Sequence, residues 1–141
     1  AACGSNCGVG PSELVASILN LSAAADPDMV LVAKANCGIP QYVDGAIRYD
    51  GTPELMARYV QLAVDSGARI IGGCCGTSPE HLAAMRKALD AYVPGSRPDA
   101  VMLEATLGQI STGARAQLSG NLDRAAGSAS GAAPRVRRRR G

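Results

Sequence analysis

Two adjacent cysteines, Cys74 and Cys75, stand between a short apolar run and a sequence typical of a helix start. Side chains of neighbouring strand residues point to opposite faces, so both sulfurs can reach one point only where the backbone leaves regular strand geometry. The flanking glycines, Gly72, Gly73 and Gly76, permit that departure because they adopt backbone angles closed to other residues. We therefore expect the two sulfurs to converge just beyond the end of a strand.

Cys7 is the best candidate for a third ligand of a metal ion at this point. It lies in the sequence Gly-Ser-Asn-Cys-Gly at residues 4–8, which also looks like a strand end beside glycines. Zinc binds thiolates in tetrahedral geometry, and a site with three protein ligands leaves one position open for water or substrate. The sequence predicts a zinc site made by Cys7, Cys74 and Cys75.

A redox pair is the alternative role for Cys74 and Cys75. Adjacent cysteines form a disulfide only with strain, and redox motifs usually place two residues between their cysteines. Zinc is therefore the favoured interpretation once Cys7 is counted.

The remaining cysteines and the histidine fit structural roles. Cys3 and Cys37 are expected to be small buried or loop residues, because a free cysteine behaves as a small hydrophobic residue. His81 is the only histidine of the chain, so it has no second histidine at metal-binding spacing. We expect it at the surface or in support of the ligands.

Strand and helix signals alternate around these motifs. Proline stands at the expected first helical position three times, and apolar residues follow it at helical spacing. The buried stripe of the third helix is expected to contain Leu82, Met85, Leu89 and Tyr92. The expected elements are helices from Pro11 to about Ala24, from Pro53 to just before Gly67 and from Pro79 to about Tyr92, and strands at 29–33 and 69–73.

This alternation is typical of a parallel α/β architecture. Residues 34–40 should form the loop after the first of these strands. Residues 41–51 show no clear period and are expected to continue as a long loop.

The two cysteine motifs, with Lys-Ala-Asn-Cys-Gly-Ile-Pro at 34–40, resemble the homocysteine S-methyltransferase family over residues 1 to about 92. The resemblance implies a (β/α)8 barrel whose zinc is held by Cys7, Cys74 and Cys75. Such barrels need about 250 residues, so a chain of 141 residues is expected to be the C-terminal part, with about three βα units. The N-terminal half of the barrel would then be required for activity.

The implied reaction is attack by the thiolate of homocysteine on an activated methyl group, which gives methionine. Zinc would hold the substrate thiol and lower its pKa. Asn6 and Asn36 are candidates for binding the polar end of the substrate, although satisfying their own loops is the slightly favoured role. The methyl donor is open among betaine, S-methylmethionine, S-adenosylmethionine and a methylfolate. An onium donor prefers aromatic faces, and the chain offers only four tyrosines.

The expected domains are the barrel portion at 1–93 and an Ala/Gly/Arg-rich tail at 94–141. A short amphipathic piece from Val101 to Ile110 is expected to dock, and disorder is expected beyond Ser111. The arginines at the end look like those of bacterial betaine-homocysteine methyltransferase-like members. A solvated tail is favoured over a nucleic-acid contact there, because no aromatic module accompanies the arginines.

Composition excludes several classes of function. The net charge of +2 predicts no polyanionic partner, and no apolar run approaches the about 18 residues of a membrane span. Five cysteines, an odd number, do not suit a disulfide framework, so we expect a reducing cytoplasm.

An open half-barrel is also expected to pair with further copies. The rival function is non-catalytic: a zinc-binding half-barrel or a protein that binds a partner through its arginine tail.

Overall fold

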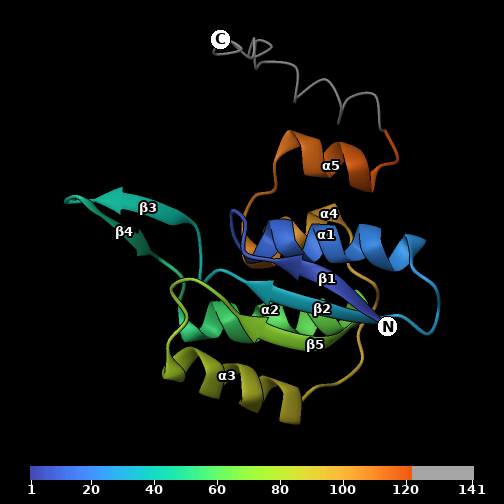
Figure 1. The fold of residues 1–141 in the computed structure, drawn as a ribbon, viewed down its shortest axis with the longest axis horizontal. Coiled ribbons are helices and arrows are strands. Elements are labelled where there is room, and N and C mark those ends of the chain that lie inside the picture. Colours follow the sequence, from blue (N-terminus) through green and yellow to red (C-terminus); the bar gives the residue numbers. More distant parts are fainter. Residues whose placement is uncertain (122–141) are drawn as a thin grey trace, which may run out of the picture.

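A parallel sheet with strand order β1-β2-β5 forms the centre of the structure, which is a computed structural model that describes residues 1–121 (Figure 1). Helices connect the strands in the right order for a βαβαβα unit, so the α/β expectation is confirmed. In chain order the elements are β1 (Ala2–Asn6), α1 (Pro11–Ala24), β2 (Val30–Ala35), β3 (Pro40–Val43), β4 (Ala46–Tyr49), α2 (Pro53–Asp65), β5 (Ala68–Gly73), α3 (Pro79–Asp90), α4 (Ala100–Leu107) and α5 (Thr112–Leu118).

The central strand β2 supplies the middle of the core. Leu31, Ala33 and Ala35 alternate along it on the buried face, and α1 and α2 pack on the sheet. Tyr59 and Ile18 are the largest side chains that these helices bury completely. Because alanines dominate this face of β2, the large side chains of the core come from the helices.

The helix starts agree with the sequence. Pro11, Pro53 and Pro79 each occupy the start of a helix, where the missing N–H of proline leaves no hydrogen bond unmade. Before α2, the Thr52 hydroxyl accepts a hydrogen bond from the Leu55 N–H at 3.2 Å. Such a cap contributes about 1 kcal/mol to stability.

Helix α3 differs from expectation in one respect. Met85 is buried, but Leu82 is half exposed although it was expected in the buried stripe. The reason is that α3 packs chiefly against α2 and has no comparable contact with β5. Its buried face within the described residues is therefore narrow.

The expected long loop at 41–51 is wrong, because β3 and β4 form an antiparallel hairpin there (Figure 1). Asp44 and Gly45 make the turn with φ of 51° and 80°. Two consecutive positive φ angles at Asp-Gly are typical of the tight hairpin turn whose twist matches that of the strands. Both strands of the hairpin are almost wholly exposed, so the sequence carries no buried alternation that would reveal them.

The expectation of disorder beyond Ser111 is wrong for residues 112–118, which form α5. The preceding expectation is confirmed: Leu103, Leu107 and Ile110 are buried, so the 101–110 piece does dock. Both α4 and α5 pack against α1. Residues 122–141, including the arginines, lie outside the described part of the chain.

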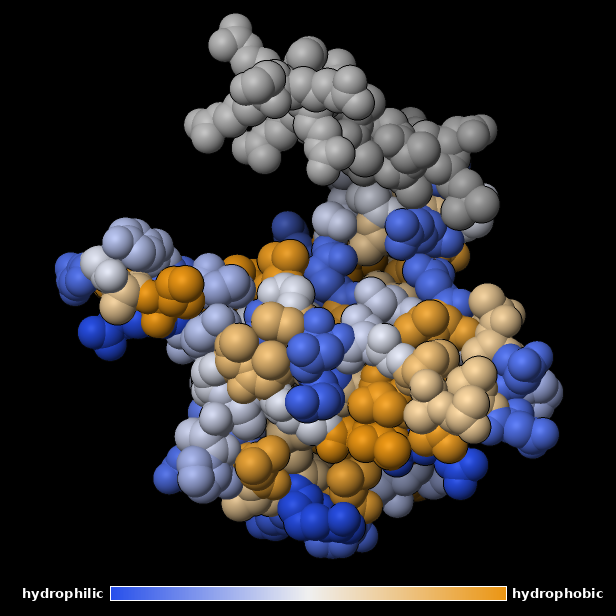
Figure 2. All heavy atoms as spheres, viewed as in Figure 1, coloured by the Kyte–Doolittle hydropathy of each residue, from blue (hydrophilic) through white to orange (hydrophobic). Residues whose placement is uncertain are grey.

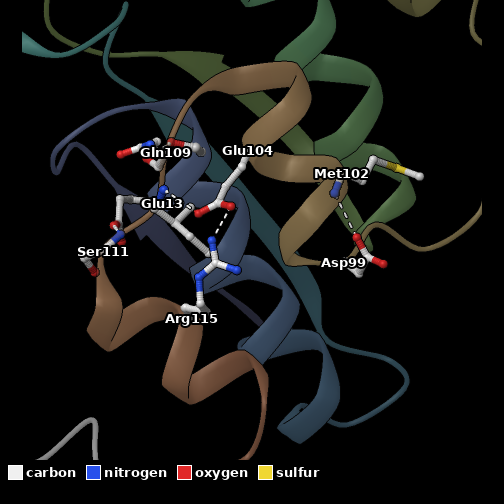
Figure 3. A network of polar contacts seen from close by, with 9 residues as sticks. Glu13, Asp99, Met102, Glu104, Gln109, Ser111 and Arg115 are labelled. Carbon is white, nitrogen blue, oxygen red and sulfur yellow. Dashed lines mark hydrogen bonds and ion pairs between the residues drawn. The ribbon is translucent and has the colours of Figure 1, made fainter.

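Polar contacts attach α4 and α5 to one another and to α1 (Figure 3). Glu104 of α4 forms an ion pair with Arg115 of α5, and the Glu13 carboxylate accepts a hydrogen bond from the Ser111 N–H. The Ser12 hydroxyl donates to the Gln109 carbonyl oxygen at 3.2 Å. Composition alone does not reveal such long-range partners, which explains why α5 was not predicted.

No helix within residues 1–121 is long and apolar enough to cross a membrane.

We predict that the α4 contact contributes substantially to stability. Leu103 is 0% exposed, so Leu103→Ala leaves a cavity and should lower the free energy of unfolding by about 2–5 kcal/mol. Val101, on the same helix but 69% exposed, provides the matched control. Val101→Ala should change the free energy of unfolding by less than about 0.5 kcal/mol. Urea denaturation of the three proteins measures the difference. Equal stability of the two variants would contradict the docking of α4.

Candidate metal centre

The sulfurs of Cys7, Cys74 and Cys75 lie together at one edge of the sheet. The Cys7 and Cys75 sulfurs are 3.8 Å apart, those of Cys74 and Cys75 are 3.7 Å apart, and all three lie within 4.8 Å of one another. A tetrahedral zinc with bonds of about 2.3 Å places its sulfur ligands about 3.8 Å apart. The arrangement therefore fits a tetrahedral metal ion, and the expected convergence of the three cysteines is confirmed.

Strand β2 positions two of these cysteines through its last carbonyl groups. The Cys7 N–H donates to the Lys34 oxygen at 2.9 Å, and the Cys74 N–H donates to the Ala35 oxygen at 2.8 Å. β1 and β5 flank β2 on opposite sides and run parallel to it, so both cysteines emerge at the same edge. The sulfurs thus meet over the carboxyl end of the central strand.

The backbone leaves strand geometry at both motifs, as expected. Cys7 itself has a φ of 69°, unusual for a residue with a side chain. After β5, the Thr77 N–H bonds to the Cys74 oxygen at 3.2 Å and closes a turn whose third residue, Gly76, has a φ of 76°. Glycine suits that position because the conformation disfavours a side chain. The turn places the sulfur of Cys75 on the same side as the sulfur of Cys74, 3.7 Å away.

Cys37 holds the backbone of Cys75 by a hydrogen bond. It is 1% exposed, and its N–H donates to the Cys75 oxygen at 2.9 Å. Burial and the nearby Asp50 raise the pKa of its thiol, which favours the neutral form. Cys37 is buried and Cys3 packs against the core, as expected of small apolar side chains, and within residues 1–121 neither belongs to the sulfur cluster.

The two asparagines occupy different environments. Asn36 is 1% exposed, and its Nδ2 donates to the Gly8 oxygen at 2.5 Å, which ties the loop after β2 to the Cys7 loop. Its Oδ1 is buried without a partner in the described structure. Asn6 is exposed at the end of β1, where its backbone pairs with Lys34. Asn36 therefore has the loop role that was favoured, with one acceptor still available.

His81 connects the start of α3 to the loop before α2. Its Nδ1 accepts from the Ser78 N–H at 3.1 Å, so its Nε2 carries the proton and donates to the Gly51 oxygen at 3.2 Å. Within residues 1–121 it belongs to no metal-binding cluster. It supports the site at a distance, one of the two roles expected for it.

Tyr49 is the residue of this site that the sequence interpretation missed. The pKa of its phenol is raised, chiefly by the neighbouring Cys75 thiol. Its side chain lies against Gly76, where an added Cβ would stand 2.5 Å from the Cβ and Cγ of Tyr49. The Asp-Gly turn signal at 44–45 would have predicted the hairpin and placed Tyr49 at its base.

The pKa values of the adjacent thiols Cys75 and Cys74 shift in opposite directions. The hydrogen bond with the Cys74 thiol, at 3.7 Å, lowers the pKa of the Cys75 thiol, and the neighbouring Tyr49 and Cys7 lower it further. The pKa of Cys74 is raised instead, first by burial and then by the bonds to Cys75 and Cys7. Of these two thiols, Cys75 is therefore the first to ionise as the pH rises.

We predict that iodoacetamide labels Cys75 of the metal-free chain before it labels Cys37. The thiolate is the reactive form, and Cys75 is exposed with a lowered pKa whereas Cys37 is buried with a raised one. Peptide mass spectrometry after timed labelling near neutral pH measures both rates. Zinc should protect Cys75, and labelling of Cys37 at an equal rate would contradict the described environments.

The family model for homocysteine S-methyltransferase matches residues 1–89. The match covers well over half of the chain and includes the three clustered cysteines, the hairpin and almost all of α3, while α4 and α5 lie beyond it. The match also confirms the resemblance seen in the cysteine motifs. The chain belongs to the homocysteine S-methyltransferase family.

Proposed function

We propose that this chain provides the zinc site and part of the homocysteine pocket of a homocysteine S-methyltransferase. The observation that carries the proposal is the sulfur cluster, whose 3.7 and 3.8 Å separations suit the edges of a zinc tetrahedron. Thiolate ligands favour zinc over magnesium or calcium, which prefer oxygen ligands. Such a site requires reduced cysteines, for which the cytoplasm is the proposed compartment.

The three cysteines would act as the protein ligands and leave one position for the substrate. When bound, zinc would accept the thiol of homocysteine and lower its pKa, so that the sulfur is nucleophilic at neutral pH. Cys75 is exposed and Cys7 and Cys74 are half-buried, which gives a substrate access to the cluster. Three anionic ligands would also limit the net positive charge that the substrate sulfur experiences.

In the proposed reaction the homocysteine sulfur forms a bond to the methyl carbon as the bond between that carbon and the donor breaks. The products are methionine and the demethylated donor. The N-terminal end of α3 follows the Cys74-Cys75 turn directly, and the positive end of its dipole favours a substrate carboxylate nearby. Asn6, exposed at the end of β1, and Asn36 are proposed to bind the polar end of homocysteine.

We also propose that further barrel strands complete the site. β1 and β5 each have one unpaired edge within residues 1–121, and Ile70 is exposed on the sheet face opposite the helices. Hydrophobic surface is visible in front of the strands in Figure 2. The N-terminal half of the barrel would cover this surface and supply the donor pocket. Without it, pairing with a second copy of the chain would cover the same edges.

We predict one zinc ion per chain, lost on replacement of any ligand. Cys74→Ala removes one of three thiolates and should reduce zinc affinity by at least about 100-fold, beyond the 10- to 100-fold typical of losing an outer hydrogen-bond partner. Cys3→Ala, which changes a half-buried cysteine outside the cluster, is the matched control and should retain the metal. Elemental analysis after dialysis measures the content. Full occupancy in Cys74→Ala would refute the assignment.

Methyl transfer tests the reaction itself. The polypeptide that carries the complete barrel should form methionine from homocysteine with one of the four donor classes, and Cys74→Ala should abolish turnover. Labelled methyl donors and product chromatography provide the measurement. Stoichiometric zinc without methionine from any donor would favour the non-catalytic zinc-binding function instead.

A further inference from the structure

We propose that His81 is a positioning residue of the metal centre, because its side chain closes a ring of hydrogen bonds that begins and ends at Cys75. The inference rests on the proposed function, since it concerns how one of the three proposed zinc ligands is held. It gives the histidine a part in the metal site although, within residues 1–121, its side chain belongs to no metal-binding cluster.

The first half of the ring consists of backbone groups. The Cys37 N–H donates to the Cys75 oxygen at 2.9 Å, and the Cys37 oxygen accepts from the Gly51 N–H at 3.1 Å. Cys37 therefore uses both of its backbone groups to join Cys75 to Gly51. The oxygen of Gly51 makes the next link.

His81 supplies the second half through its two ring nitrogens. Its Nε2 donates to the Gly51 oxygen at 3.2 Å, and its Nδ1 accepts from the Ser78 N–H at 3.1 Å. A backbone N–H can only donate and a carbonyl oxygen can only accept, so each nitrogen has a defined role. The chain from Cys75 to Ser78 then completes the ring.

Close packing at Gly51 leaves the ring little freedom. A Cβ on Gly51 would stand 2.5 Å from the carbonyl carbon of Cys37 and 2.7 Å from its sulfur, so the two residues lie in direct contact. Cys37 itself is 1% exposed. The residue after Gly51 is Thr52, which caps α2. A shift of Gly51 would therefore disturb both a buried cysteine and the start of a helix.

Cys75 needs this support more than the other two ligands do. The N–H groups of Cys7 and Cys74 donate to the end of β2, whereas Cys75 lies beyond the end of β5 and is exposed. A ligand that the surrounding structure already holds loses less conformational freedom when the metal binds. The ring should therefore raise the affinity of the site for zinc.

The test compares two replacements of His81 that both preserve the start of α3. Glutamate and glutamine at this position can each accept the hydrogen bond from the backbone N–H of the capping residue, which is Ser78. Only glutamine has an N–H group that can donate to the Gly51 oxygen, because an ionised carboxylate is an acceptor alone. His81→Glu thus opens the ring at Gly51, and His81→Gln keeps a donor there.

We expect zinc affinity in chelator competition to fall about tenfold in His81→Glu, the lower end of the range typical of outer partners of metal ligands, and to recover in His81→Gln. In the metal-free His81→Glu chain the amide hydrogens of Cys37 and Gly51 should exchange faster, whereas those in the middle of α2 should keep their rates. Ala83→Glu, which adds the same charge at an exposed position of α3, is the matched control and should alter neither measurement.

The two replacements separate positioning from a general effect on stability. A glutamate near the N-terminus of a helix interacts favourably with its dipole, and its charge would by itself attract a cation, so neither effect explains weaker zinc binding. Unchanged zinc affinity or unchanged exchange at Cys37 in His81→Glu, or an equal loss of affinity in His81→Gln, overturns the role of His81 while the proposed function stands. Failure of the unmodified chain to bind zinc would overturn the proposed function itself, and the positioning role with it.

Discussion

The metal centre depends on the last two carbonyl groups of β2. They accept the N–H groups of Cys7 and Cys74 from the strands on either side, so one strand end sets the distance between two ligand loops. The same strand leads directly into Asn36 and Cys37, which bond to Gly8 and to Cys75. Both ligand loops are therefore positioned by a single strand, whose buried face packs against the helices on one side of the sheet.

The part of the site that follows from strand geometry could be predicted from the sequence. The carboxyl ends of neighbouring parallel strands lie at the same edge of a sheet. Once the strands were recognised, cysteines at two such ends could therefore be predicted to lie close together. The hairpin could not be found by the same reasoning, because Tyr42 and Ile47 are exposed and give no buried face to detect. Only the Asp-Gly turn signals the hairpin in the sequence. Because the hairpin was not predicted, Tyr49 at its base was missed as well.

Helix α5 shows a second limit of sequence reasoning. Its short sequence, Thr-Gly-Ala-Arg-Ala-Gln-Leu, contains little apolar surface, and its order derives from partners far away in the chain. Arg115 pairs with Glu104, and Ser111, which caps the helix, also bonds to Glu13 of α1. Such pairing cannot be deduced from local composition, whereas the docking of α4 could be, because Leu103 and Leu107 mark a buried stripe.

The metal-free arrangement of the site contains two unfavourable features that a bound cation would offset. Cys7 adopts a left-handed backbone conformation, which costs of order 1–3 kcal/mol for a residue with a side chain. Three sulfurs within 4.8 Å also cannot all ionise without repulsion. The backbone bonds to β2 are independent of the metal and keep Cys7 and Cys74 near each other, whereas Cys75, exposed beyond the strand end, is held by the backbone bond from Cys37 and by the packing of Tyr49 on Gly76. The sheet thus positions two ligands without the metal, and the loop that contains Cys37 holds the backbone of the third.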